Sequence, residues 1–104
     1  MTSEPVIAGK RRAQLQSFLD RARQMTAERL LLFPTSPMYQ SISAQLEAIA
    51  SDLETGRAPT PEVRDRIMFG VYAAREIEEV DPGYADVLHN VSYIYKHGGT
   101  LRER

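Results

Sequence analysis

The sequence contains no cysteine and no long apolar run, and each absence excludes a class of protein. Without cysteine the chain forms neither disulfides nor thiolate metal sites, and it fits a reducing compartment such as the bacterial cytoplasm. An apolar run such as residues 30–33 is far shorter than the roughly 20 residues of a membrane-spanning helix. The opening MTSEPVIAGKRR also lacks the apolar segment of a signal peptide. We therefore predict a cytoplasmic protein that has no membrane partner.

Residues that carry out catalysis or hold metals are equally scarce. The two histidines, His89 and His97, are eight positions apart on one expected helix, whereas a helical metal pair needs a spacing of three or four. Asp86 and His89 have the spacing of a carboxylate–histidine pair, but a surface ion pair is the simpler interpretation. There is no glycine-rich phosphate loop and no organised nucleophile. We expect no enzyme activity, no metal and no cofactor.

The net charge is only −1, but the charges are separated along the chain. Residues 1–34 carry six Lys or Arg against three acids, and residues 35–81 carry nine acids against four arginines. The basic run that starts at Lys10 favours nucleic acid, but the helix expected after residue 60 is acidic and would be repelled by phosphate. We interpret the basic run as a solvated face and expect no nucleic-acid partner.

Three dipeptides divide the chain, each pairing an oxygen-bearing side chain with proline: Ser36-Pro37, Thr60-Pro61 and Asp81-Pro82. The first residue of each can accept a hydrogen bond from a free N–H in the first turn of a helix. Proline suits the first helical position, where no such bond is needed. Each dipeptide therefore predicts the capped start of a helix.

Between these starts, apolar residues recur every three or four positions, which is the spacing of an amphipathic helix. The expected helices cover residues 8–32, 37–54, 61–79 and 82–97, with Gly98-Gly99 ending the last. The apolar residues 30–33 close the first of these segments, and Pro34 prevents its continuation.

Short connections make consecutive helices antiparallel neighbours. We therefore predict an all-α, four-helix, up-and-down-like bundle in a single domain over residues 1–104, frayed at 1–7 and 100–104. Its expected core includes Leu15, Phe18, Ile42, Leu46, Ile49, Val71, Val87 and Val91.

Carboxylates gather where the third expected helix gives way to the fourth. Glu76, Glu78 and Glu79 are expected at a helix C-terminus, where the helix dipole disfavours negative charge. At least one tyrosine of the fourth helix must be exposed, and tyrosine is enriched at interfaces. A solvated surface offset by Arg75 is the alternative. We name Glu76, Glu78, Glu79, Asp81 and Asp86 the acidic corner, and together with Tyr84 they are the candidate partner-binding residues.

Local patterns in residues 22–97 occur in an order that suggests a family. RLLLFP at 29–34 is followed by Tyr39, SAQL at 43–46 is followed by Ile49, residues 74–76 lead into Asp81-Pro82, and a tyrosine-bearing helix surrounds 91–95. In this order the chain resembles the small helical immunity proteins that protect bacteria against type VI secretion effectors, in particular an effector with an NAD(P)-glycohydrolase toxin domain. The basic N-terminal extension departs from that pattern.

The resemblance implies a cytoplasmic antitoxin that binds a cognate effector toxin domain stoichiometrically and blocks its active site. A nucleotide- or NAD-consuming toxin needs a basic cleft, which the acidic corner would complement. A helical interaction or adaptor module, or a homodimer with Met68 and Tyr72 at its seam, remains open. A nucleic-acid-binding antitoxin is the third interpretation.

Overall fold

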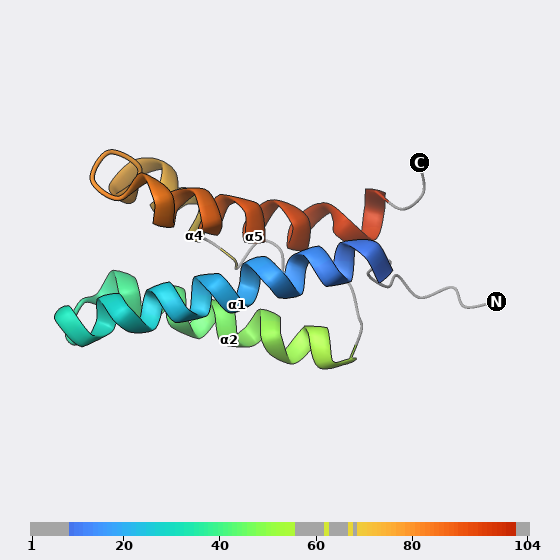
Figure 1. The fold of residues 1–104 in the computed structure, drawn as a ribbon, viewed down its shortest axis with the longest axis horizontal. Helices are drawn as coiled ribbons and strands as arrows, with labels where there is room; N and C mark the ends of the chain where they lie inside the picture. The colour runs from blue at the N-terminus through green and yellow to red at the C-terminus, as the bar shows by residue number, and fades with distance from the viewer. Residues whose placement is uncertain (1–8, 56–61, 63–66, 68, 102–104) are drawn as a thin grey trace.

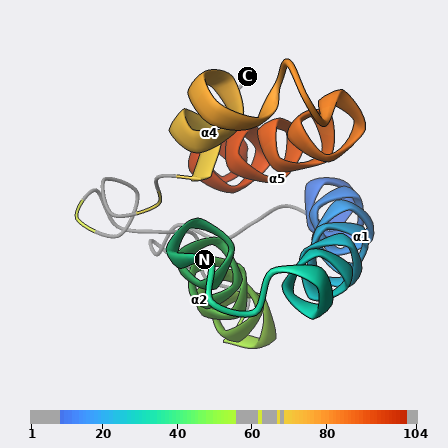
Figure 2. The ribbon, with the colours of Figure 1, turned by 90° about the vertical axis from the view of Figure 1, so that its left-hand side faces the viewer.

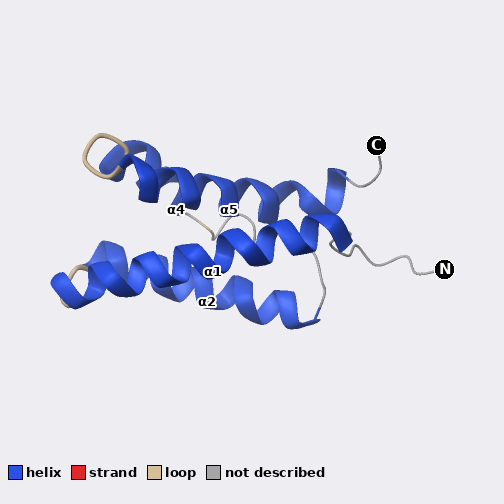
Figure 3. Cartoon of the chain, in the orientation of Figure 1, coloured by secondary structure: helices blue, strands red, loops and turns tan. Residues whose placement is uncertain are grey.

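The computed structural model describes residues 9–55, 62, 67 and 69–101, and the part of the chain so described is helical without a strand (Figures 1 and 3). The elements are α1 (Gly9–Leu32), α2 (Pro37–Thr55), α4 (Phe69–Tyr72), the π-helix η1 (Ala73–Ile77) and α5 (Pro82–Leu101). The prediction of a small all-α bundle of four helices is confirmed.

Helix α1 lies between α2 and α5 and packs against both. The ribbon shows α1 running antiparallel to each of them, so that the turn after α1 and the turn before α5 lie at the same end of the bundle (Figure 1). Helix α4 and η1 cover one side of α5, and α4 also contacts α2 (Figure 2). At Gly70 a Cβ would lie 3.0 Å from the Ser92 Oγ, so glycine allows α4 to approach α5 this closely.

The predicted cap at Ser36 is confirmed, because its Oγ accepts a hydrogen bond from the Tyr39 N–H at 3.2 Å. Thr60 lies outside the described residues. The prediction for Asp81 is wrong in part. Its carbonyl accepts the first bond of α5, from Ala85 N–H at 3.0 Å, but its carboxylate bonds to Arg29 on α1.

The first two helices begin and end within a residue of the predicted positions, but the later helices differ. η1 ends at Ile77, so Glu78 and Glu79 lie in a turn and not at a helix terminus as predicted. Helix α5 continues through Gly98-Gly99 and so includes residues 100 and 101. Each glycine weakens a helix by about 1 kcal/mol but ends it only where a left-handed residue and its capping bonds form.

The core lies where α1, α2 and α5 face one another. The spacing predicts an apolar stripe on α2 that begins at Tyr39, and its other four members are buried: Ile42, Leu46, Ile49 and Leu53. Tyr39 is half-buried and packs against the core from its edge. Leu15, Val87 and Val91 are buried as predicted, whereas Phe18 is half-buried and packs against the core from its edge. The side chains of Val71, Tyr72 and Met68 lie outside the described set. Two tyrosines, Tyr84 and Tyr95, are fully buried. The apolar spacing of the fourth helix places Tyr84 on its inward face, whereas it does not identify Tyr95 as a core residue.

The position of Leu46 gives a direct test of this core. Leu46→Ala is expected to lower the free energy of unfolding by about 2–5 kcal/mol, because the side chain is fully buried and the neighbouring helices fill the cavity only partly. Leu31→Ala, which removes the same atoms from a side chain that is 83% exposed, is expected to change it by about 0.5 kcal/mol or less. Urea denaturation followed by circular dichroism measures both, and equal costs would contradict this packing.

Candidate partner-binding surface

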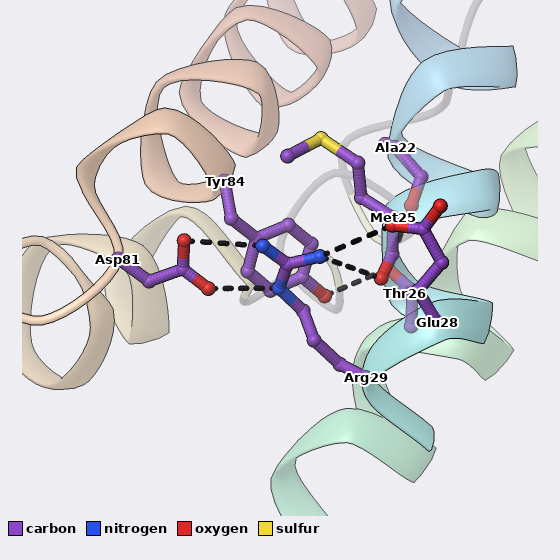
Figure 4. A network of polar contacts seen from close by, with 7 residues as sticks. All are labelled: Ala22, Met25, Thr26, Glu28, Arg29, Asp81 and Tyr84. Atoms are coloured by element: carbon purple, nitrogen blue, oxygen red, sulfur yellow. Dashed lines mark hydrogen bonds and ion pairs between the residues drawn. The ribbon is translucent and has the colours of Figure 1, made fainter. Parts of the chain in front are cut away.

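One ion pair joins the two turns at the shared end of the bundle. The Arg29 side chain leaves the last full turn of α1 and meets Asp81, the residue before α5 (Figure 4). Its Nε lies 2.7 Å from one carboxylate oxygen, and its Nη2 lies 3.1 Å from the other. The pair is therefore bidentate, the geometry that gives an arginine–carboxylate contact both strength and orientation.

Arg29 is held on its other sides as well. Its Nη1 donates to the Met25 carbonyl at 3.0 Å, and Glu28 lies 3.7 Å away. The guanidinium carbon lies 4.4 Å from the centre of the Tyr84 ring, which is a cation–π distance. Hydrogen bonding to Asp81 raises the pKa of Arg29 further above its usual value, so the charge is permanent.

Tyr84 supports Arg29 from inside the bundle. Its hydroxyl lies 2.7 Å from the Thr26 Oγ1 (Figure 4). Thr26 already donates its single hydroxyl proton to the Ala22 carbonyl at 2.7 Å, so Tyr84 is the donor to Thr26. Burial raises the pKa of Tyr84 to about 12, even though the nearby charge of Arg29 favours the ionised form. The prediction that Tyr84 lies on a binding surface is wrong, because α1 covers its ring and hydroxyl.

A short series of aromatic rings continues from Tyr84 toward the surface. The centroids of Tyr84 and Tyr39 are 6.1 Å apart, and those of Tyr39 and Phe33 are also 6.1 Å apart. Tyr84 is buried, Tyr39 is half-buried and Phe33 is 55% exposed. The turn between α1 and α2 is thereby packed onto the same residues that hold Arg29.

The carboxylates of the acidic corner have different roles. Glu76, Glu78, Glu79 and Asp86 are exposed, whereas Asp81 is half-buried and bound by Arg29. Glu76 lies in η1 beside the exposed Arg75, and Glu78 and Glu79 lie in the turn. Four of the five are thus free to meet solvent or a partner. The expected exposed tyrosine of α5 is Tyr93, which is 58% exposed.

Four exposed apolar side chains at this end were not expected. Leu31 is 83% exposed, Leu32 74% and Val80 82%, and Phe33 joins them. The inward face of α1 passes through Leu19, Ala22 and Thr26 to Arg29, and the helical period turns residues 31 and 32 away from it. We name Leu31, Leu32, Phe33 and Val80 the apolar tip.

Other kinds of site find no support in the described residues. No three or more of the His, Asp and Glu side chains placed by the structure come together as metal ligands would. None of the described helices has both the length and the apolar character needed to cross a bilayer.

The Arg29–Asp81 pair can be compared with a second bidentate pair whose arginine also belongs to α1. Arg29→Met is expected to lower the free energy of unfolding by about 1.5–3 kcal/mol, because it leaves a partly buried carboxylate without its donor. Arg23→Met breaks the Arg23–Glu47 pair, whose side chains are 42% and 57% exposed. The side chains of the Arg29–Asp81 pair are only 20% and 28% exposed. Arg23→Met is expected to cost at most about 1 kcal/mol. Chemical denaturation of both variants checks the difference, and equal losses would mean that burial does not strengthen the Arg29 pair.

The raised pKa of Tyr84 predicts a loss of stability in alkali. A phenol that ionises near pH 10 in the unfolded chain and near 12 in the folded chain stabilises the fold fully below pH 10. That stability is lost as the pH rises toward 12, by roughly 2–3 kcal/mol. Tyr84→Phe is expected to have a lower free energy of unfolding than the parent at neutral pH. Between pH 10 and 12, however, its free energy of unfolding should fall by less than that of the parent. Unfolding free energies at several pH values measure this, and parallel curves for parent and variant would refute it.

A comparison with models of known protein families identifies the family of this chain. A model of the Tsi6 family matches residues 14–97, which include both partners of the Arg29–Asp81 pair. Comparison with curated proteins and with solved structures gives no match. Since the matched segment covers well over half of the sequence, the chain belongs to the Tsi6 family, a family of immunity proteins.

Proposed function

We propose that this chain is an immunity protein that binds the toxin domain of a type VI secretion effector in the cytoplasm and blocks its active site. Family membership supports the protective role. The exposed carboxylates of the acidic corner are the observation that carries the mode of action. The family implies a non-enzymatic role, so protection would come from stoichiometric binding, with one chain occupying one toxin domain.

The charge of the exposed corner favours a particular class of toxin. A domain that consumes NAD or another nucleotide must bind phosphate groups, and it does so with basic side chains in a cleft. Glu76, Glu78 and Glu79 present three carboxylates on η1 and the following turn, where they would complement such a cleft. Complementary charge also speeds encounter, which matters to a cell whose nucleotide pool is being consumed.

The placement of these carboxylates suits an inhibitor. They lie on a turn that the Arg29–Asp81 pair fastens to α1, so the turn does not have to be ordered when a partner binds. Pre-ordered surfaces lose less conformational freedom on association. The half-buried Asp81 would support the turn and leave contact with the toxin to its exposed neighbours.

Reversing two of the exposed charges tests the proposal. Glu78→Lys with Glu79→Lys is expected to weaken binding of an effector toxin domain at least tenfold at low salt, mainly through slower association, and less at high salt. The double variant changes the formal net charge from −1 to +3, since each reversal adds two. Surface plasmon resonance at two salt concentrations measures the rates, and a nucleotide-consumption assay with equimolar protein measures protection.

The matched control reverses two other exposed acids, Asp20 on α1 and Glu54 near the end of α2. Asp20→Lys with Glu54→Lys produces the same net charge away from the acidic corner, so it should bind with nearly the parent affinity. Equal weakening in both double variants would show that only overall charge matters. Unchanged binding in the Glu78/Glu79 variant would show that the acidic corner is a solvated surface.

A further inference from the structure

The exposed apolar residues of this protein are concentrated at one end. Among the described residues, five large hydrophobic side chains are exposed, and four of them form the apolar tip. The fifth, Tyr93, lies midway along α5. Single exposed apolar residues are ordinary on protein surfaces, but a concentration of them marks a surface that binds another molecule.

The apolar tip comes from two segments that are far apart in the sequence. Leu31 and Leu32 end α1 and Phe33 follows directly, whereas Val80 belongs to the turn before α5. Figure 1 shows both turns at the same end of the bundle. The bidentate bond from Arg29 to Asp81 joins them, since Arg29 lies two residues before Leu31 and Asp81 directly follows Val80. The two parts of the tip are therefore held in a fixed relation.

Charge around the tip distinguishes between possible occupants. Glu28, Glu76, Glu78, Glu79 and Asp81 supply five negative charges, and Arg29 and Arg75 supply two positive charges, which leaves −3 at this end. A two-fold interface pairs identical surfaces, so a second copy that docked by the same end would place two ends of net charge −3 against each other. The two copies would repel. A partner with a basic surface would instead be attracted. The local charge thus argues against self-association through this end.

We propose that the apolar tip is the anchor by which this chain docks onto the toxin domain, entering an apolar depression with a basic rim. This inference rests on the proposed function and names the surface that would hold the complex together. Buried apolar anchors surrounded by polar contacts account for most of the binding energy in many interfaces. The carboxylates around the tip steer the encounter, and the apolar side chains slow dissociation.

The two kinds of residue therefore predict different kinetic effects. Loss of carboxylates should slow association and reduce its dependence on salt. Loss of the apolar tip should speed dissociation and leave the salt dependence unchanged, because no charge is altered. This difference separates the anchor from the acidic corner even though both belong to one end of the bundle.

A triple variant tests the anchor: Leu31→Gln, Leu32→Gln and Val80→Thr. Glutamine has nearly the helix propensity of leucine, threonine keeps the branched shape of valine, and all three side chains are exposed, so the fold should be retained. Phe33 is left unchanged because it packs against Tyr39. The matched control is Tyr93→Gln, which removes an exposed apolar side chain from the middle of α5.

The probe is the catalytically inactivated toxin domain of the cognate effector. We expect the triple variant to bind it about 100-fold more weakly, with most of the change in the dissociation rate, and the Tyr93 control to stay within about threefold of the parent. Circular dichroism and urea midpoints verify the fold of each variant. Sedimentation of the free proteins gives their oligomeric state.

Hydrogen exchange of the parent complex provides a second measurement that needs no variant. Amides of residues 29–33 and 78–81 should become protected together when the toxin domain binds. Protection elsewhere only, or a triple variant that binds as tightly as the parent, would overturn the anchor and leave the proposed function intact.

A parent that is dimeric while the triple variant is monomeric would show that a second copy covers the tip, which also overturns the anchor. A parent that binds no toxin domain at all would overturn the proposed function and the anchor with it.

Discussion

The bond between Arg29 and Asp81 fixes the geometry of the end of the bundle on which the functional proposals depend. It connects residues 52 positions apart, at 2.7 and 3.1 Å, and most of each side chain is shielded from water. Shielding strengthens the attraction but makes loss of either partner costly. The stacked ring of Tyr84 restricts the arginine further. The turn before α5 is consequently positioned by α1 as well as by its own helix.

This arrangement separates residues that shape the surface from residues that a partner can touch. Asp81 and Tyr84 belong to the first kind, because one is bound by Arg29 and the other is buried against Thr26. The exposed carboxylates and the apolar tip belong to the second kind. In the proposed role the chain would bind one toxin domain tightly and quickly, and a rigid support beneath an exposed mixed surface suits both requirements. Membership of the Tsi6 family gives that surface a biological context.

Local rules predicted much of the framework. Helices α1 and α2 follow the apolar spacing, the Ser36 cap forms as its dipeptide predicts, and four of the five residues in the apolar stripe of α2 are buried. Such features depend on residues within a few positions of one another, so a sequence pattern contains the information needed. The accessibility of the glutamates in the turn also follows from their own chemistry, since unpaired charges are rarely buried.

The sequence by itself determined a small helical bundle, the starts of α2 and α5, and the place where its carboxylates gather. Tertiary structure alone decided what those residues do. The buried Tyr84 hydroxyl finds its hydrogen-bond acceptor in Thr26, 58 positions away, and Asp81 became an ion-pair partner because α1 brings Arg29 to it. Leu31 and Leu32 remain exposed because the packed face of α1 is set by its two neighbouring helices. Each outcome depends on contacts between distant segments, which a local pattern does not specify.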